Sequence, residues 1–154
     1  MEIREAAASE AGTLSALAFE AKAHWGYSRE ILESWKDQLA FSISVVASRP
    51  TYIAAIRGEI VGFYSLVPSE HAWELDHLWV APQFTRRGIG RALMTHALKV
   101  AFESGAISVT VDSDPNAEPF YLSLGATRCG EIPAPIPGQP SRVRPQLAFN
   151  GRAT

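Results

Sequence analysis

Residues 80–92 read Val80-Ala81-Pro82-Gln83-Phe84-Thr85-Arg86-Arg87-Gly88-Ile89-Gly90-Arg91-Ala92, which predicts the end of a strand, a basic glycine turn and the start of a long helix. The two glycines lack the Cβ atoms that would keep a phosphate away from the main chain. Main-chain N–H groups at a helix start bind anions, because they lie at the positive end of the helix dipole. The stretch therefore predicts an anion site, with a nucleotide-like cofactor as its ligand.

A Gly-x-Gly turn alone is a weak signal, because glycines occur in many strand-to-helix turns for steric reasons. Two familiar phosphate-binding loops do not match this one. A dinucleotide-binding loop needs a third glycine at position 93, where Leu93 stands. A nucleoside-triphosphate loop needs Gly-Lys followed by Ser or Thr, which the sequence lacks. What remains is a turn whose main chain faces a pyrophosphate.

Composition favours one domain over residues 1–154, because a chain of 154 residues with 47% hydrophobic content can bury a core. The formal net charge of -2 and the absence of a long basic run argue against a nucleic-acid partner. The single cysteine, Cys129, cannot form an intrachain disulfide or a cysteine-based zinc cluster, and it fits a cytoplasmic location. We expect neither a secretion signal nor a membrane-spanning segment.

Strand-like and helix-like periods alternate along the chain, which indicates an α/β domain. Ser9 and Ser28 are the expected N-caps of two amphipathic helices, and residues 44–47 look extended. The other expected strands are 3–6, 52–56, 60–67, 73–80, 107–112, 126–131 and 143–149, and the other expected helices are 88–104 and 117–124. Residues 132–140 hold four prolines and a glycine and predict a loop.

Two motifs, in this order, resemble those of the GNAT family, the GCN5-related N-acetyltransferases. The first runs from Leu75 to Val80 and on through the turn 85–90, and it resembles the family's Gln/Arg-x-x-Gly-x-Gly/Ala turn, with Thr85 at the first position. The second is Asn116-Ala117-Glu118-Pro119-Phe120-Tyr121-Leu122-Ser123-Leu124-Gly125-Ala126, which resembles the family's Asn…Phe-Tyr-x-x-x-Gly-Phe/Ala segment. The resemblance implies a mixed α/β (α+β) fold, with six to seven mostly antiparallel strands and about four flanking helices.

The resemblance also implies that the chain binds acetyl-CoA as a co-substrate, with no metal. The residues expected to contact the cofactor are Leu78, Trp79, Val80, Thr85, Arg86, Arg87, Gly88, Ile89, Gly90, Arg91, Asn116 and Phe120. Among them, the main-chain N–H of Leu78 or Val80 is the expected oxyanion donor. Asn116 resembles the residue that hydrogen-bonds the pantetheine arm or a bound water, and it also fits an Asx turn or a helix N-cap.

Acyl transfer to an amine needs a base for the amine and a proton for the leaving thiolate. Taken by itself, Tyr121 is more typical of a half-buried aromatic paired with Phe120, but within the second motif it resembles the family's general acid. Asp76 resembles the base, with Glu74 as second choice, since regular strand geometry places both on one face. Both also read as polar groups in a solvent-lined cleft, and His77 is a further candidate.

The segment around Trp25 and Tyr27 joins the first two helices, where the family usually binds its acceptor, and Asp76 would face the same substrate. The two aromatic rings read equally as a hydrophobic plug. The expected function is N-acetylation of a primary amine, of a small molecule, by direct transfer. A non-catalytic acyl-CoA sensor and a peptide or protein N-acetyltransferase are the alternatives. The proline-rich segment could cover the acceptor or form the edge of a homodimer.

Overall fold

The computed structural model describes residues 1–151, so the expected domain range 1–154 runs past the described residues at 152–154. Its strands are β1 (Glu2–Glu5), β2 (Thr51–Ile56), β3 (Glu59–Val67), β4 (Ala72–Val80), β5 (Ser108–Asp112), β6 (Thr127–Pro133) and β7 (Val143–Asn150). Its helices are α1 (Ala11–Ala23), α2 (Arg29–Leu39), α3 (Ile43–Ser48), α4 (Ile89–Glu103) and α5 (Glu118–Ser123), with short 3-10 helices η1 (Ala8–Glu10) and η2 (Pro82–Phe84).

The fold class expected from the sequence is confirmed. The seven strands follow the order β1-β2-β3-β4-β5-β7-β6 in one sheet, in which β4 and β5 run parallel. The pairs β1–β2, β2–β3, β5–β7 and β6–β7 are antiparallel. The part of the chain that the structure describes has five α-helices, one more than expected.

The chain divides into two compact units. The first comprises Met1–Leu66 and His77–Ala97, and the second comprises Val67–Asp76 and the chain from Leu98 onwards. Strand β4 and helix α4 each contribute residues to both.

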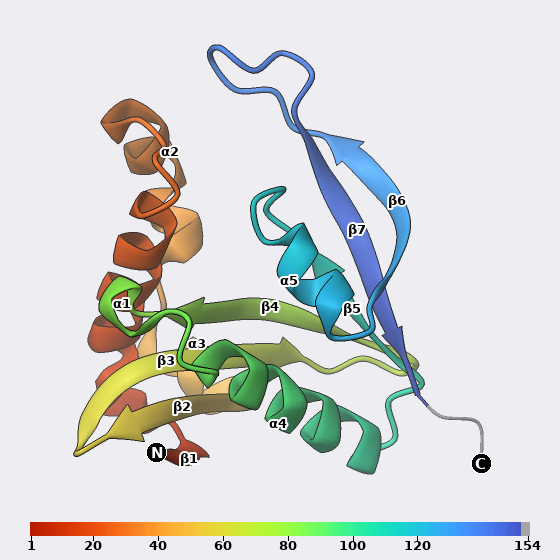
Figure 1. Ribbon diagram of the computed structural model, residues 1–154. Coiled ribbons are helices and arrows are strands. Elements are labelled where there is room, and N and C mark those ends of the chain that lie inside the picture. The colour runs from red at the N-terminus through yellow and green to blue at the C-terminus, as the bar shows by residue number, and fades with distance from the viewer. Residues whose placement is uncertain (152–154) are drawn as a thin grey trace. The chain divides into compact units, whose positions relative to one another are not determined.

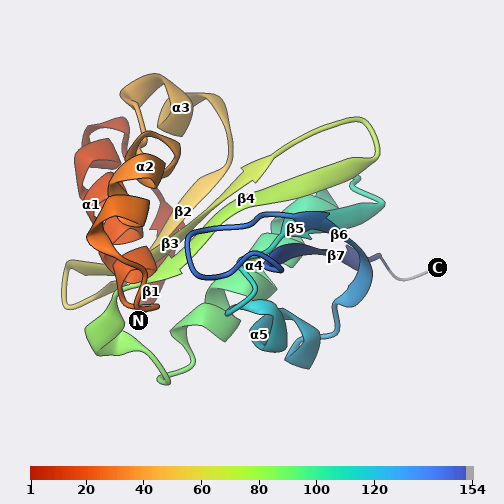
Figure 2. The same ribbon diagram turned by 90° about the horizontal axis from the view of Figure 1, so that it is seen from above.

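In the first unit, one face of β2 and β3 forms the core with α1. Leu14 and Ala18 of α1 are fully buried and belong to the same hydrophobic cluster as Ile53 and Phe63 of the two strands. Strands β2 and β3 join through Arg57 and Gly58, whose φ angles of 52° and 81° are those of a hairpin turn with two left-handed residues. Figure 1 shows this hairpin beside β1, and Figure 2 shows α1 and α2 side by side.

The opposite face of β2 and β3 carries the first half of α4. The rings of Tyr52 and Tyr64 stack with centroids 5.4 Å apart on this face, and the Tyr64 hydroxyl lies 2.7 Å from Nδ1 of His96. Gly62 lies against the side chains of Ile89 and Leu93. The start of α4 therefore rests directly on β3, which fixes where the preceding turn ends.

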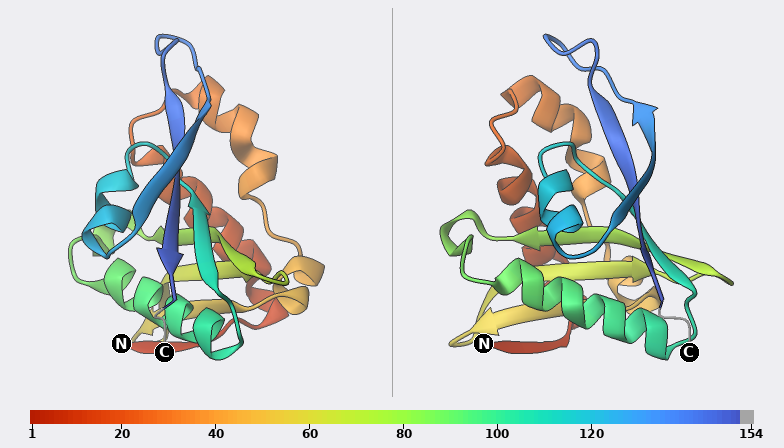
Figure 3. Two further views of the ribbon diagram at one scale, coloured as in Figure 1. Left: turned by 90° about the vertical axis from the view of Figure 1, so that its right-hand side faces the viewer. Right: turned by 45° about the vertical axis from the view of Figure 1, so that its right-hand side comes forward.

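In the second unit, β7 lies between β5 and β6. Strand β4 pairs with β5 over Ala72–Leu75, and β6 and β7 form a long twisted hairpin with residues 134–142 at its tip (Figure 3). Strand β6 runs to Pro133, so it takes up the first two residues of the predicted loop. Cys129 is exposed on β6, and its thiol donates to the carbonyl of Gln146 at 3.3 Å.

Two local predictions are wrong, and both concern serine caps. Ser9 lies inside η1, and the capping acceptor is the Glu10 carboxylate, which takes the Ala7 N–H at 2.8 Å. Residues 44–47 belong to α3, because the Ser42 hydroxyl accepts the Val45 N–H at 3.1 Å and starts a helix that buries Val46. The prediction for Ser28 is confirmed: its hydroxyl accepts the Ile31 N–H at 3.3 Å at the start of α2.

Candidate functional site

The glycine turn of the first unit bends through two left-handed residues. Helix η2 ends at Phe84, and the hydroxyl of the next residue, Thr85, donates to the carbonyl of Pro82 at 3.0 Å. Arg86 then has φ 63° and Gly88 has φ 79°, after which α4 begins at Ile89. A left-handed arginine is strained, since its Cβ crowds the following carbonyl. Strain of this kind is commonly retained at binding sites.

The main chain of this turn offers hydrogen-bond donors. The Ala92 N–H donates to the Gly88 carbonyl at 3.0 Å, which is the first bond of the α4 ladder. The hydrogen bonds within residues 1–151 include none donated by the main-chain N–H groups of Gly88, Ile89, Gly90 or Arg91. These donors lie at the positive end of a 15-residue helix, an arrangement that suits a phosphate or pyrophosphate.

Three arginines surround these donors, and all three are exposed. The Arg87 guanidinium lies 5.2 Å from the centroid of the Phe84 ring, so η2 holds its side chain locally. Arg86 and Arg91 are exposed on either side of the two glycines. The basic turn before a long helix is therefore present as the sequence predicts, and its binding of an anion or a cofactor stays a prediction.

The end of β4 also belongs to the first unit. Leu78, Trp79 and Val80 are half-buried, and the β5 register, which covers Ala72–Leu75, does not include them. The Trp79 indole N–H donates to Nδ1 of His77 at 3.0 Å, so a neutral His77 carries its proton on Nε2. His77 packs edge-on against Phe41, with ring centroids 4.5 Å apart. The His77 ring is thus packed against Phe41 and accepts a hydrogen bond from Trp79.

The two candidate bases lie in the second unit, on the first half of β4. Burial alternates along this part of the strand: Trp73 and Leu75 are buried, while Glu74 and Asp76 are exposed. Both carboxylates therefore occupy the same face, as the period of two predicts. Either carboxylate can accept a proton in contact with solvent.

The second motif of the sequence starts in a turn organised by Asp114. Its carboxylate Oδ1 accepts the main-chain N–H of Asn116 at 2.8 Å and the side-chain Nδ2 of Asn116 at 2.9 Å. The Asp114 carbonyl accepts the Ala117 N–H at 2.9 Å, just before α5. The Asx-type acceptor is therefore Asp114, and Asn116 is the residue whose amide it orients.

Tyr121 is the buried residue of α5, with 6% of its surface exposed. Burial, and to a smaller extent the charge of Asp114, raise the pKa of the Tyr121 phenol well above its ordinary value. The ring of Phe120 packs edge-on against it at 5.2 Å. Among residues 1–151 no hydrogen bond engages the Tyr121 hydroxyl, so a protonated phenol here has a donor to offer.

Trp25 and Tyr27, the two aromatic residues expected to bind an acceptor, have different surroundings in the structure. Trp25 is 45% exposed, whereas Tyr27 packs edge-on against Trp35 at 4.9 Å. The Lys22 ammonium lies over three rings, 4.7 Å from Trp35, 5.3 Å from Tyr27 and 5.9 Å from Trp79. Tyr27 therefore belongs to an aromatic cage around a cation, and Trp25 stands outside it.

Two residues of this cage, Lys22 and Trp35, are not among the acceptor contacts predicted from the sequence. Lys22 is in the last turn of α1, and Trp35 is one of the apolar positions of α2, so each fits an ordinary helix pattern. Their contact depends on the angle between α1 and α2. A lysine at a helix end, five residues before a tyrosine, was the only available signal.

Two absences hold over residues 1–151. No group of three or more histidine, cysteine, aspartate or glutamate side chains is arranged to hold a metal ion. No helix in this range combines the length and the apolar character needed to cross a bilayer.

Comparison with known proteins covers most of the chain. The sequence profile of the Acetyltransferase (GNAT) family matches residues 14–126, which include the glycine turn and Tyr121. A curated relative, the uncharacterized N-acetyltransferase YafP of Escherichia coli (strain K12), is 35% identical over 91 residues, which are 59% of this chain and 50% of that protein. The chain therefore spans about half the length of this relative.

Solved structures share the fold. A GCN5-related N-acetyltransferase from Rhodopseudomonas palustris, also described as a class-II aminotransferase, gives a TM-score of 0.79 at 24% identity, over 97% of this chain and 94% of that one. The PaiA N-acetyltransferase of Thermoplasma acidophilum, in complex with coenzyme A, gives 0.77 at 20% identity, over 97% and 98%. An aminoglycoside 6'-N-acetyltransferase complexed with coenzyme A gives 0.70 at 19% identity, over all of both chains. With the profile matched over well more than half of its length and the fold shared throughout, this protein belongs to the acetyltransferase (GNAT) family.

Proposed function

We propose that this protein transfers an acetyl group from acetyl-CoA directly to a primary amine of a small molecule. The observation that carries the proposal is the turn before α4, where four adjacent main-chain N–H groups from Gly88 to Arg91 donate no hydrogen bond within residues 1–151. Arg86 and Arg87 add positive charge beside them. Two proteins of the same fold were solved with coenzyme A bound, which supports a CoA pyrophosphate as the ligand.

The proposed reaction uses a base at the acceptor amine and an acid at the leaving thiolate of CoA. Asp76, or Glu74 through water, takes a proton from the acceptor ammonium, and the neutral nitrogen forms a bond to the thioester carbonyl carbon. The C–S bond breaks, and the Tyr121 hydroxyl gives its proton to the leaving thiolate. Main-chain N–H groups of Leu78 or Val80 donate to the carbonyl oxygen as it gains charge. The proton on the carboxylate passes to solvent, and the freed carboxylate then takes the second proton that the nitrogen must lose to become an amide. That proton also passes to solvent, and the phenol is reprotonated from solvent.

The state of Tyr121 supports this assignment. A phenol is protonated at neutral pH, which is the form a general acid needs, and burial, which raises the pKa of Tyr121, keeps it in that form until a thiolate forms beside it. Tyr121→Phe should lower kcat by about 100-fold while the dissociation constant for CoA stays unchanged. Tyr52→Phe, on β2, is the matched control and should keep full activity. If Tyr121→Phe transfers acetyl groups at the wild-type rate at every pH, the acid role is wrong.

The anion turn can be tested with a matched pair of arginines. Arg57 and Arg86 are both exposed and are the two non-glycine residues with positive φ within residues 1–151. We expect Arg86→Gln to weaken CoA binding by about tenfold and to reduce its salt dependence. Arg57→Gln should leave both unchanged. Equal effects of the two substitutions would mean that the turn is not where CoA binds.

The acceptor is proposed to be a small amine that contacts Trp25, Tyr27 and Asp76. Trp25 is exposed and so can contact a ligand, and the Lys22 ammonium lies 5.3 Å from the centroid of the Tyr27 ring. A screen of amines that follows CoA release identifies the acceptor, and Trp25→Ala should then raise its KM without changing the KM of acetyl-CoA. If no amine releases CoA although the protein binds acetyl-CoA tightly, a non-catalytic sensor is favoured. Turnover of peptides alone would favour a peptide or protein N-acetyltransferase.

Several expectations stay predictions beside this proposal. They are a single acetyltransferase domain, a cytoplasmic location, the absence of a nucleic-acid, membrane or metal partner, and a possible homodimer. Size-exclusion chromatography with light scattering would decide the last of these.

A further inference from the structure

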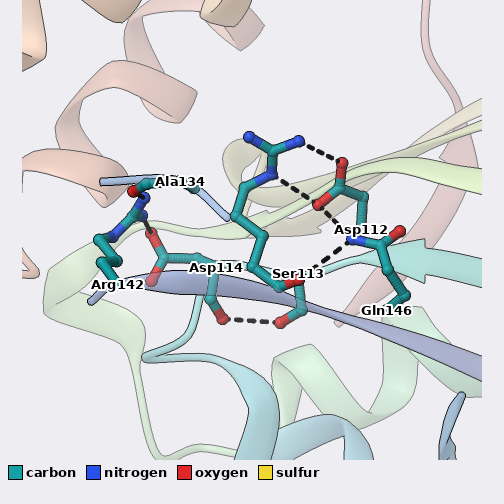
Figure 4. Close-up of polar contacts among 7 residues, drawn as sticks. Asp112, Ser113, Asp114, Ala134, Arg142 and Gln146 are labelled. Atoms are coloured by element: carbon teal, nitrogen blue, oxygen red, sulfur yellow. Dashed lines mark hydrogen bonds and ion pairs between the residues drawn. The ribbon is translucent and has the colours of Figure 1, made fainter. Parts of the chain in front are cut away.

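Arg142 is a buried arginine at the end of the proline-rich segment. Only 4% of its side chain is exposed, and its partner Asp114 is 7% exposed, with Nη2 of the guanidinium 3.6 Å from Oδ2 of the carboxylate. Its Nη1 donates to the carbonyl of Ala134 at 3.0 Å, and its own carbonyl accepts the Ala134 N–H at 3.0 Å. Arg142 thus closes the base of the loop 134–142 and reaches from there to the loop before α5 (Figure 4).

The same carboxylate serves the second motif with its other oxygen. Oδ2 of Asp114 faces Arg142. Oδ1 accepts one hydrogen bond from the main-chain N–H of Asn116 at 2.8 Å and one from its side-chain Nδ2 at 2.9 Å. The Ser113 hydroxyl donates to the Asp114 carbonyl at 2.7 Å and completes the turn. A charged acceptor that is held on one side by a cation cannot rotate without losing its bonds on the other.

We infer that Arg142 is a positioning residue for the cofactor: through Asp114 it holds the amide of Asn116 in the orientation that receives the pantetheine arm. The inference rests on the proposed function, since it takes Asn116 as a cofactor contact. The bond from Nδ2 of Asn116 to Asp114 fixes the orientation of the amide, and the amide oxygen, which has two lone pairs, is the atom that would accept an N–H of the arm. The proline-rich segment, through Arg142, then acts as the fixed support of this contact.

Arg144, the second residue of β7, shows why burial matters here. Arg144 pairs with Asp112 at 2.8 Å, closer than Arg142 to Asp114, but the two side chains are 40% and 36% exposed. Exposed pairs are screened by water and contribute little, whereas a buried carboxylate depends on its partner. Asp112 also accepts a bond from Gln146 at 3.0 Å, so it keeps a partner when Arg144 is lost. Arg144 is therefore the matched control for Arg142.

The experiment compares CoA with its nucleotide part, 3'-phospho-ADP, by isothermal titration calorimetry. If Arg142 acts on the pantetheine arm, Arg142→Gln weakens CoA binding by about tenfold and leaves 3'-phospho-ADP unchanged. Arg144→Gln should change neither. In an Asn116→Ala background the effect of Arg142→Gln should vanish, because the two residues act in series. Equal weakening of both ligands, an unchanged CoA affinity, or additive effects with Asn116→Ala would each overturn the inference.

A variant that removes both charges keeps the inference testable if Arg142→Gln fails to fold. Arg142→Met with Asp114→Asn leaves no buried charge without its partner, and the asparagine amide still offers an oxygen to Asn116. This double variant should fold, and its CoA affinity should fall as in Arg142→Gln. Wild-type affinity in the double variant would overturn the inference. Failure of the wild-type protein to bind CoA at all would instead refute the proposed function.

Discussion

Gly62 of β3 and Leu93 of α4 approach so closely that a Cβ atom on Gly62 would lie 2.9 Å from Cδ1 of Leu93. The same Cβ would lie 2.9 Å from the main-chain oxygen of Trp79, which cannot rotate away. Only glycine allows the strand and the helix to meet in this way. Since α4 starts a few residues before Leu93, this contact sets the position of the turn that holds the candidate anion site.

Gly62→Ala should therefore destabilise the protein by about 1–3 kcal/mol, the usual cost of overpacking a core. We also expect weaker CoA binding, because the start of α4 moves away from β3. Thermal unfolding and calorimetric titration measure the two effects. Gly12→Ala, where a Cβ meets nothing within 4 Å, is the control. A Gly62→Ala protein as stable as the wild type would show that the contact is not tight.

Gly88→Ala tests the backbone of the turn separately from its packing. A Cβ on Gly88 meets no atom within 4 Å, so the strain comes from its φ of 79° alone. A left-handed alanine costs about 1–2 kcal/mol, and relief of this strain would redirect the N–H groups of the turn. CoA affinity should fall, whereas Gly130→Ala, also in open space but with an ordinary φ, should bind CoA normally. Unchanged affinity in Gly88→Ala would contradict the assignment.

Glu10 should stabilise the protein in a way that depends on acid pH. Hydrogen bonds from Arg4 and from the Ala7 N–H lower the pKa of Glu10 from 4.5 to about 2. Its contribution is thus fully present above the unfolded-state value and is lost as the pH falls toward the folded-state value. Because the Arg4 side chain is 41% exposed, we expect only about 1–2 kcal/mol.

Urea unfolding of the wild type and Glu10→Gln at about pH 7 and about pH 2 measures this contribution. The two proteins should differ at neutral pH and converge in acid. A difference of the same size at both pH values would mean that the carboxylate charge has no part in capping η1.

Tyr121 should make the folded protein sensitive to alkali. Burial raises the pKa of its phenol above the ordinary value of 10.0, so the unfolded chain loses the proton first. Stability is therefore complete below the unfolded-state pKa and falls as the pH rises beyond it, by up to about 1.4 kcal/mol per pH unit. Tyr121→Phe should fall less steeply than the wild type above about pH 10 in urea unfolding. Parallel curves for the two proteins would contradict the burial of the phenol.

Local patterns in the sequence predicted much of this structure because they act over a few residues. The alternation of Trp73 and Leu75 with Glu74 and Asp76 needs only the period of a strand. The helix cap at Ser28 needs only a hydroxyl near the next N–H groups. The glycine turn likewise takes its shape from its own residues.

Local sequence patterns could not predict other features, because the same residues fit two structures or two capping schemes. Ser42 and the β-branched residues of 43–46 are compatible with a strand, but capping by Ser42 and burial of Val46 favour α3. At η1, Ser9 and Glu10 are both acceptable caps, and the choice falls to Glu10 because Arg4 of β1 holds its carboxylate with bonds of 2.9 and 2.8 Å. A contact with strand β1 thus decides which residue caps η1.

The remaining features join residues that are far apart in the sequence. The cage around Lys22 needs Trp79 from β4, and the pair Asp114–Arg142 joins the loop before α5 to the end of the proline-rich segment. Neither pair has a spacing that any periodicity describes. Such contacts become visible only when the positions of the elements are known.

The exposed thiol on β6 gives the protein a ready attachment point. Cys129 is the chain's single cysteine, so a maleimide fluorophore or spin label reacts at one known position without any prior substitution. Because its strand pairs with β7, which leads directly from the loop closed by Arg142, a probe there reports whether the surroundings of this hairpin change when ligands are added. The protein can thus be followed in real time, by emission or by electron paramagnetic resonance, in its natural sequence.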